Sequence, residues 1–536
     1  MEEAFQKFFN TCGPCRPSRH HLVPAVDRAP VVRQLVEDGV SFFLRGPSQS
    51  GKTTLALELA REISSCGRFH ALYMTLQEAR GVRGRGLSAR LFREALDAAL
   101  KAHPDPMLRG VSLPPPDRGD SPRSSVRRAL ERLCLSLDRP LVLFIDELDM
   151  LSGSALQSLL DQIASGLVTG RPEAFPRCVG LLGLRPPEPG GRREAEAGPG
   201  RYPRRAPDAP AGAPPGNPLA MAREIRLPPL TFADISKLCE LHAAAGGQEV
   251  EEEAKLRLWD WTEGGPWLVN ALLSTALDFV LHGDPKAAVT AAAVDESARA
   301  LLRETPAHLR RLAGLLSDTG VRRACCEALC GGSAGQALAG GGEALALDLG
   351  LLSAGWDDRL RPAGGICRGL ITRALTSHIR PPAAPAAGCR GEGEGPDMTL
   401  LLQEFQRQWR WNSASWRAPL ADIFGAGERL PLLAFLERAL PEGATLEKRP
   451  AAAEGGLALA VRGAGRTRPA LAVLERPGGP GHLAYLEELS AVMDAEGTSE
   501  GWLCFFDLDP AKGADERIFW KTRSLASGRT AHIAGL

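Results

Sequence analysis

The sequence predicts an α/β protein that begins with a parallel β-sheet and continues into a mostly helical region and then a mixed block. Over residues 30–185, short apolar runs alternate with amphipathic helical patterns, as a parallel sheet covered by helices requires. From about residue 229 to 380 the apolar spacing is helical, as at Ile235, Leu238 and Leu241. A chain of 536 residues, of which 44% are hydrophobic, can bury several cores of ordinary domain size.

Four strands are expected in the parallel sheet, at the apolar runs 41–44, 71–74, 141–145 and 179–182. Between the second and the third, Val126, Leu130, Leu133 and Leu137 recur at helical spacing and stop before Pro140, so a helix is expected there. Another helix is expected from Thr54, after the first strand and a short loop.

Two stretches rich in Pro, Gly and Ala divide the chain. Residues 186–218 are predicted to be an insertion in the first domain, and residues 381–397 are predicted to be a linker. We therefore expect an N-terminal segment at 1–29, a sheet-containing domain at 30–228, a helical region at 229–300, a further region at 301–380 and a C-terminal domain at 398–536.

The charge balance excludes a uniformly basic protein, because 64 basic side chains face 64 acidic ones. A local basic face for nucleic acid remains compatible with this balance. The longest aliphatic or aromatic run, at 141–145, is far shorter than the roughly 20 residues that cross a bilayer. The N-terminus opens with two acids and lacks the pattern of a secretory signal. We expect no membrane contact and a cytoplasmic location.

The twelve cysteines are too sparse for a disulfide scaffold. Cys12 and Cys15 form a C-x-x-C pair, but no strand is expected before them, which disfavours a redox site. Cys325, Cys326 and Cys330 lie close together on a predicted helix without a suitably spaced His, which disfavours zinc. Ordinary buried thiols are the preferred interpretation.

A complete G-x-x-x-x-G-K-[ST] motif lies between the first strand and the helix that follows it. Its residues are Gly46, Pro47, Ser48, Gln49, Ser50, Gly51, Lys52 and Thr53, and Thr54 continues into the helix. Inward-facing backbone N–H groups and the positive end of the helix dipole suit such a loop to phosphates. Lys52 would reach the β and γ phosphates and Thr53 would bind Mg²⁺, so the motif predicts ATP and Mg²⁺ as ligands. The alternative is a glycine turn.

Two adjacent acids end the third predicted strand. Asp146 is placed to hold Mg²⁺ opposite Thr53, and Glu147 to orient and deprotonate the attacking water. Glu147 therefore favours hydrolysis over binding alone. Asp149 could position this pair, or it could be an exposed acid at a helix start.

Arg185 follows the fourth predicted strand, where such enzymes place a group that senses the γ-phosphate. It is the sensor candidate, and the alternative is a solvated loop arginine. Downstream, Gly264-Gly265-Pro266 between helices would start a helix of a lid that closes over the nucleotide, or would only break a helix.

These residues make the chain resemble the prokaryotic AAA-like P-loop ATPases, distant relatives of origin-recognition and signal-transducing ATPases. The resemblance rests on Gly46 to Thr53, on Asp146 with Glu147, on Gly183-Leu184-Arg185 and on Pro266 to Asn270. It implies a P-loop ATPase domain, a helical lid at 229–300 and a winged-helix-like segment at 301–380.

The C-terminal block is similar to the PD-(D/E)XK nuclease-like domains found at the end of many such ATPases. The resemblance places Ala458 where the metal-binding Asp belongs, and Val473-Leu474-Glu475 where Glu-x-Lys belongs. Because a methyl or isopropyl group cannot bind a metal, the domain is predicted to be inactive as a nuclease. Glu475 followed by Arg476 leaves one route to activity.

The leading hypothesis is an ATP-hydrolysing conformational switch that acts on an unknown protein partner. The alternative is a protein that binds or processes DNA, and a third hypothesis is a scaffold with an inactive pocket. DNA would be bound by arginines of the winged-helix segment and by an Arg/Trp cluster. The arginines are Arg303, Arg310, Arg311, Arg322 and Arg323, and the cluster is Arg407, Trp409, Arg410, Trp411, Trp416 and Arg417.

Overall fold

The computed structural model describes residues 7–113, 121–169, 173–185, 222–330, 341–355, 359–377, 397–417, 426–440, 445–449, 457–462, 470–476, 486–507, 512–525 and 528–536. They form two compact units, one of Met1–Leu301 with Asp348–Gly350 and one of Leu302–Leu347 with Leu351–Leu536. The insertion predicted at 186–218 and nearly all of the linker predicted at 381–397 lie outside the described residues.

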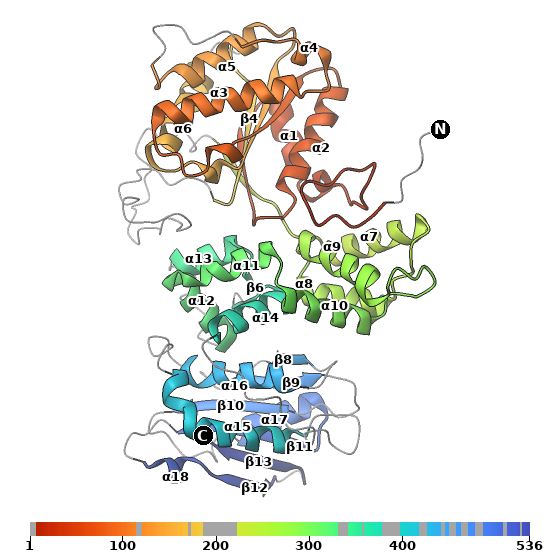
Figure 1. The fold of residues 1–536 in the computed structure, drawn as a ribbon, viewed down its shortest axis with the longest axis vertical. Coiled ribbons are helices and arrows are strands. Elements are labelled where there is room, and N and C mark those ends of the chain that lie inside the picture. The colour runs from red at the N-terminus through yellow and green to blue at the C-terminus, as the bar shows by residue number, and fades with distance from the viewer. Residues whose placement is uncertain are drawn as a thin grey trace. The chain divides into compact units, whose positions relative to one another are not determined.

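The first unit contains a parallel sheet in the order β2-β3-β4-β1-β5 (Figure 1). Its strands are β1 (Phe42–Arg45), β2 (His70–Thr75), β3 (Leu141–Asp146), β4 (Cys178–Gly183) and β5 (Arg223–Arg226). The four predicted strands are therefore confirmed. The fifth strand was not predicted, because it is short and exposed except at Ile225.

Helices cover both faces of this sheet (Figure 1) because its strands are apolar on both faces. On one face, Leu141, Leu143 and Ile145 pack among residues of α3 (Arg85–Lys101), α5 (Ser125–Leu135) and α6 (Gly153–Thr169). On the other, Val142 and Phe144 pack with α1 (Val31–Asp38) and α2 (Lys52–Ser65). The remaining short elements are η1 (Ala25–Arg28), η2 (Gln77–Ala79), α4 (Pro106–Arg109) and η3 (Leu148–Met150).

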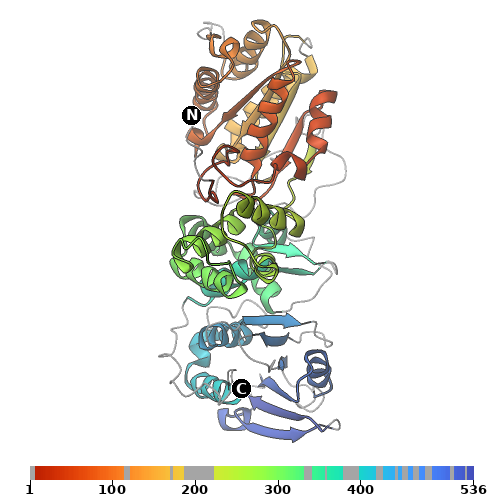
Figure 2. The ribbon, with the colours of Figure 1, turned by 90° about the vertical axis from the view of Figure 1, so that its right-hand side faces the viewer.

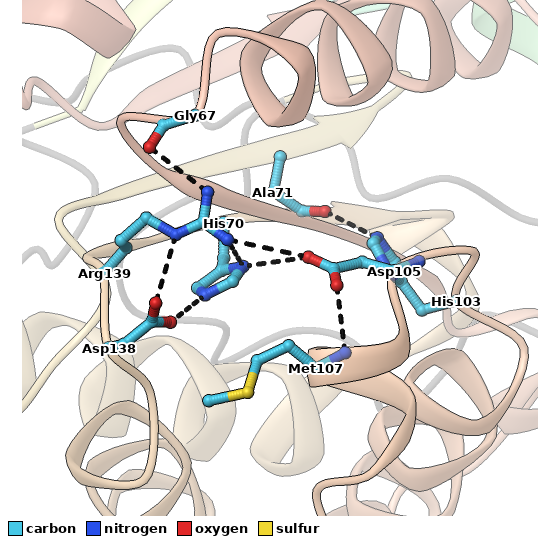
Figure 3. Close-up of polar contacts among 8 residues, drawn as sticks. All are labelled: Gly67, His70, Ala71, His103, Asp105, Met107, Asp138 and Arg139. Carbon is cyan, nitrogen blue, oxygen red and sulfur yellow. Dashed lines mark hydrogen bonds and ion pairs between the residues drawn. The ribbon is translucent and has the colours of Figure 1, made fainter.

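A polar cluster lies at the amino ends of β2 and β3 (Figure 3). The buried His70 ring lies between two carboxylates, with Nε2 at 2.7 Å from Asp138 Oδ1 and Nδ1 at 3.4 Å from Asp105 Oδ2. Arg139 also reaches Asp105, at 3.8 Å. Neighbouring strands of this sheet run parallel, so their amino ends lie together and their carboxyl ends lie together. The cluster is at the amino ends, whereas the P-loop follows the carboxyl end of β1.

The helical region after β5 consists of α7 (Phe232–Ala244), α8 (Glu252–Thr262), α9 (Pro266–Thr275), the π-helix η6 (Ala276–Val280) and α10 (Ala291–Glu304). Thr231 and Asp234 form a capping box that starts α7. The N-terminal segment lies against this region, because Trp267 Nε1 donates to Thr11 O at 2.9 Å and Asn270 Nδ2 donates to Asn10 O at 3.0 Å.

The second unit begins with helices and a two-stranded hairpin. Its elements are α11 (Ala307–Gly314), η7 (Leu315–Ser317), α12 (Thr319–Cys330), α13 (Gly341–Asp348), of which Asp348 belongs to the first unit, β6 (Leu352–Ala354), β7 (Leu360–Pro362) and α14 (Gly364–Leu375). The strands pair antiparallel, with Leu352 opposite Pro362. The assignment of residues 301–380 as a winged-helix-like segment stays a prediction.

The C-terminal part of the second unit is a six-stranded sheet in the order β12-β13-β11-β10-β9-β8. Its elements are α15 (Met398–Arg417), α16 (Ala426–Ala439), β8 (Thr445–Arg449), β9 (Leu457–Arg462), β10 (Ala470–Arg476), α17 (Leu486–Glu496), β11 (Glu500–Asp507), α18 (Ala514–Arg517), β12 (Trp520–Ser524) and β13 (Thr530–Gly535). Figure 2 shows α17 on one face and α15 with α16 on the other. Leu503 and Phe505 of β11 pack towards α17, whereas Phe506 packs on Trp409 of α15.

The free cysteines of the described residues include the exposed Cys12 and the half-buried Cys15. Burial raises the pKa of the Cys15 thiol, which is the opposite of the activation that redox chemistry needs. Cys325 and Cys326 are buried in α12, and the described residues hold no cluster of His, Cys, Asp and Glu that could bind a metal ion. Across the described part of the chain, no helix has both the length and the apolar composition for crossing a membrane.

Candidate nucleotide-binding site

The glycine-rich loop turns tightly between β1 and α2, and two of its glycines are needed for that turn. A Cβ atom on Gly46 would lie 2.9 Å from Ser50 Oγ, and Gly51 has φ +94° immediately before the helix. Gln49 also has a positive φ, of 65°. Helix α2 begins at Lys52, so its first backbone N–H groups lie at the loop. The loop is therefore a tight turn that leads directly into the N-terminus of α2.

Lys52 lies across its own loop. Its Nζ donates hydrogen bonds to the carbonyl oxygens of Gly46 at 2.7 Å and Pro47 at 2.8 Å. Ser50 Oγ is buried and has no hydrogen-bond partner among the described residues. A cation and an unpaired polar oxygen thus lie in one loop, in keeping with a polar ligand there.

The structure brings Thr53 and Asp146 together, although 93 residues separate them in the chain. Thr53 Oγ1 donates to Asp146 Oδ2 at 2.5 Å, and the same oxygen accepts a hydrogen bond from the Tyr73 hydroxyl at 3.0 Å. Asp146 is buried. Burial and the neighbouring Asp146 carboxylate raise the pKa of Tyr73, so this hydroxyl is a donor and not an anion.

Glu147 stands directly after β3 in an uncommon backbone conformation, with φ 57°. The Asp146 carboxylate fixes that conformation, because its Oδ1 accepts the Glu147 N–H at 2.7 Å. The Glu147 side chain in turn accepts a hydrogen bond from Thr75 Oγ1 at 3.2 Å. Glu147 is half-buried, so the carboxylate is held in place near the loop without being sealed from water.

Asp149 joins the turn after β3 to the end of β4. Asp149 is exposed and lies at the start of η3, yet its Oδ2 accepts the Leu184 N–H at 2.6 Å. Gly183, the last residue of β4, accepts the Gly46 N–H at 3.3 Å. The side chain of Asp149 therefore positions the backbone next to Arg185.

Two predicted site residues are engaged elsewhere. Arg185 makes an ion pair with Asp348, and no residue of the loop takes part in that pair. Thr54 is buried, and its hydroxyl accepts the Cys15 N–H at 3.1 Å, so this side chain holds the N-terminal segment. Pro47, Ser48 and Gln49 belong to the rim of the loop, where Pro47 and Ser48 are half-buried and Gln49 is exposed.

Tyr73, Thr75 and Arg28 were not identified from the sequence. Thr75 is paired with Asp146 in the register of β2 and β3, so a polar residue at the end of the neighbouring strand was the available signal. Arg28 donates to Ser50 O at 3.0 Å and to Pro228 O, which links the loop to the chain leading into α7. No local motif marks Arg28.

The predicted DNA-binding residues are divided between surface and core. Arg303, Arg310 and Arg311 are exposed, whereas the exposed Arg323 is paired with Glu327 at 2.8 Å. In the Arg/Trp cluster, Trp409 and Trp416 are buried and Trp411 is exposed. The two buried tryptophans are core residues.

The positions compared with a nuclease lie on neighbouring antiparallel strands. Ala458 of β9 is opposite Ala472 of β10, and Val473 is opposite Leu457. Glu475 lies two residues beyond this last pair. Position 458 of β9 is an alanine and so has no carboxylate. The predicted lack of nuclease activity stays a prediction.

One protein-family model matches the part of the chain that contains most of the candidate site. Residues 29–172 match the model of the AAA ATPase domain, a range that contains the loop, Asp146 and Glu147 but not Arg185. No curated protein matches the chain.

Several solved structures are similar at low identity. A Walker-type ATPase of Pyrococcus abyssi has 13% identity and a TM-score of 0.43, over 68% of this chain and 99% of that chain. Cdc6p of Pyrobaculum aerophilum has 13% identity and a TM-score of 0.35, over 66% and 94%. The Thermotoga maritima RuvB Holliday junction branch migration motor has 16% identity and a TM-score of 0.33, over 62% and 89%. These similarities are too distant to transfer an activity.

Proposed function

We propose, from the premise that residues 29–172 form an AAA-type P-loop ATPase domain, that this protein hydrolyses ATP and uses the hydrolysis cycle as a conformational switch. The observation that carries the proposal is the 2.5 Å hydrogen bond from Thr53 to Asp146. It brings the residue after the P-loop lysine to the acid at the end of β3. A glycine turn without a ligand gives no reason for that contact.

Mg²⁺ fits this pair, because a hydroxyl and a carboxylate are oxygen donors of the kind that Mg²⁺ prefers. Thr53 and Asp146 would hold the ion, which when bound would neutralise phosphate charge. Tyr73 donates to Asp146 and so orients the carboxylate.

The protein's own side chains would divide the remaining work. Lys52 would place its ammonium on the β and γ phosphates. Glu147 would accept a proton from the attacking water, and Thr75 would orient the Glu147 carboxylate. Arg185, two residues beyond the end of β4, is the proposed sensor of the γ-phosphate.

The N-terminal segment offers a route from the loop to the helical lid. Cys15 bonds to Thr54 of α2, while Asn10 and Thr11 accept hydrogen bonds from Asn270 and Trp267 of α9. A shift of α2 on hydrolysis would therefore be transmitted to α9 through residues 10–15. This supports a switch in which the lid responds to the nucleotide.

The proposal is tested by nucleotide binding and ATP turnover on two variants. Lys52→Ala should weaken ATP binding at least tenfold, as expected when a charge-assisted contact to phosphate is removed. Glu147→Gln should retain binding but lose about 100-fold or more in turnover, the usual contribution of a general base. Unchanged affinity in Lys52→Ala would contradict the P-loop assignment, and equal turnover in Glu147→Gln would remove that residue from its role.

Duplex DNA is a second proposed partner, supported by the exposed Arg303, Arg310 and Arg311. Binding should weaken steeply with salt if these side chains contact phosphates. An Arg310→Gln, Arg311→Gln double variant should bind duplex DNA more weakly than wild type. Equal binding by the two proteins would show that Arg310 and Arg311 do not contact DNA. The search for a partner would then turn to proteins.

A further inference from the structure

Asp348, Leu349 and Gly350, called here the 348–350 segment, lie next to the predicted sensor Arg185, although they are far from it in the sequence. They belong to the first compact unit, whereas the residues on both sides of them in the chain belong to the second. Asp348 is the last residue of α13 and is buried, with 9% of its surface exposed. A buried carboxylate needs a positively charged or hydrogen-bonding partner.

Two arginines of the nucleotide-binding region supply that partner. Arg185 Nε donates to Asp348 Oδ2, and Arg45 Nη1 lies 3.5 Å from Asp348 Oδ1. Arg45 is the last residue of β1 and directly precedes Gly46, so a single carboxylate joins the sensor candidate to the start of the P-loop. On its other side Arg45 is paired with Glu224 of β5 at 2.7 Å.

The 348–350 segment also lies close to the P-loop. Gly350 has φ +73°, and a Cβ atom there would lie 3.0 Å from Pro47 Cγ and 3.2 Å from Pro47 Cβ. Only glycine combines this backbone conformation with this close approach at no cost. The segment is therefore held by the ion pairs of Asp348 with Arg185 and Arg45, and its Gly350 lies close to Pro47.

We propose that Asp348 is an internal ligand of the Arg185 guanidinium and competes with the γ-phosphate of ATP. This inference rests on the proposed function, since it requires ATP in the loop and Arg185 as its sensor. Carboxylate and phosphate bind a guanidinium through the same N–H donors, so the two acceptors exclude one another on one face of Arg185. ADP has no γ-phosphate and does not compete.

The competition has two consequences. Asp348 lowers the affinity for ATP without changing the affinity for ADP. Conversely, ATP releases Asp348 from Arg185 and so removes one of the two ion pairs that hold the end of α13. ADP leaves this contact in place. The two effects go together because the coupling between two ligands of one group is reciprocal. Asp348 thus lets the chain distinguish ATP from ADP.

The first test compares the binding of ADP and of a non-hydrolysable ATP analogue by calorimetry. Asp348→Asn should tighten binding of the analogue about tenfold, which is the low end for loss of a charged hydrogen bond, and should leave ADP binding within about twofold. Glu224→Gln is the matched control, because it removes an acid from Arg45 but none from Arg185. Its ratio of the two affinities should equal that of wild type.

An Arg185→Gln background shows whether Asp348 acts through Arg185. In that background Asp348→Asn should no longer tighten binding of the analogue. The proposal is overturned if Asp348→Asn changes ATP and ADP binding equally or not at all, or if Glu224→Gln has the same effect.

Hydrogen exchange over residues 341–350 gives a readout that does not depend on hydrolysis. Without nucleotide, exchange should be faster in Asp348→Asn than in wild type or Glu224→Gln. In wild type the ATP analogue should speed exchange there and ADP should not. If wild type binds and hydrolyses ATP but these differences are absent, only the competition is wrong. If wild type binds no ATP, the proposed function fails, and the competition fails with it.

Discussion

Thr75 Oγ1 donates a hydrogen bond to Glu147 Oε2 at 3.2 Å, and this bond joins the carboxyl ends of two neighbouring parallel strands. Glu147 has φ 57° and needs an outside contact to fix its side chain as well as its backbone. Thr75 is therefore a positioning residue for the proposed general base.

Replacing Thr75 by valine keeps the shape of the side chain but removes its donor. We expect Thr75→Val to lower kcat about tenfold, the loss of one hydrogen bond to a charged group, with little change in KM. Steady-state ATP turnover measures both constants. Thr75→Ser keeps the hydroxyl and should recover most of the activity. A serine variant as impaired as the valine variant would show that the methyl group matters and the hydrogen bond does not.

His70 should contribute to stability but not to nucleotide binding. Its ring is buried and lies between Asp105 and Asp138 (Figure 3). This cluster is at the amino ends of β2 and β3, whereas the P-loop follows the carboxyl end of β1. His70→Ala leaves a cavity and removes these contacts, and should lower the thermal midpoint of the first unfolding transition by roughly 5–10 °C. ATP affinity below that midpoint should equal that of wild type.

Asp138→Asn is the control for His70, because the Asp138 side chain is 57% exposed and its amide can still accept a hydrogen bond from the ring. We expect a midpoint within about 2 °C of wild type. Equal losses in the two variants would assign the effect to the Asp138 charge and not to the packing of His70.

Gly264 should be irreplaceable for steric reasons. It has φ +74°, and a Cβ atom there would lie 1.9 Å from Leu230 O. This distance is far shorter than a van der Waals contact, so the backbone would have to move. Gly246 in the same helical region has φ +86° and open space around it. Both alanine variants carry the backbone cost of about 1–2 kcal/mol, and Gly264→Ala should lose about 1–3 kcal/mol more. Thermal unfolding of the two variants measures the difference, and equal midpoints would contradict the predicted clash.

Acid should weaken the packing of the N-terminal segment on α7. His21 Nε2 and His242 Nδ1 lie 3.2 Å apart, which requires one neutral ring to donate and the other to accept. Burial, and then the neighbouring His242, lower the pKa of His21 from 6.5 to about 4, and burial also lowers the pKa of His242. The unfolded chain therefore binds protons at a higher pH than the folded chain does.

The stability from this pair is fully present above about pH 6.5 and is lost progressively as the pH falls towards 4. The thermal midpoint should be lower at about pH 5 than at about pH 7.5. His21→Asn can keep a hydrogen bond to His242 without titrating, so its midpoint should depend less on pH. A pH dependence identical to that of wild type would exclude His21 as its source.

The loop and its acids could be found from sequence because each is a local pattern. The loop needs only consecutive backbone groups between a strand and a helix, and Asp146 and Glu147 directly follow an uninterrupted apolar run. The same reasoning located four strands of the sheet but missed β5, whose single buried side chain gives no pattern. It did not show that the Thr54 hydroxyl accepts the Cys15 N–H, and the predicted contact of Thr54 with the nucleotide stays a prediction.

What the sequence determined by itself is the chemistry of the nucleotide site, since the P-loop and the acids of β3 are encoded by neighbouring residues. Only the tertiary structure decided which side chains hold these groups. Thr75 meets Glu147 because β2 and β3 are neighbours in the sheet, and Arg185 meets Asp348 across 163 residues of chain. Such contacts follow from strand order and long-range packing, which no local spacing records, because residues far apart in the chain become neighbours only after folding.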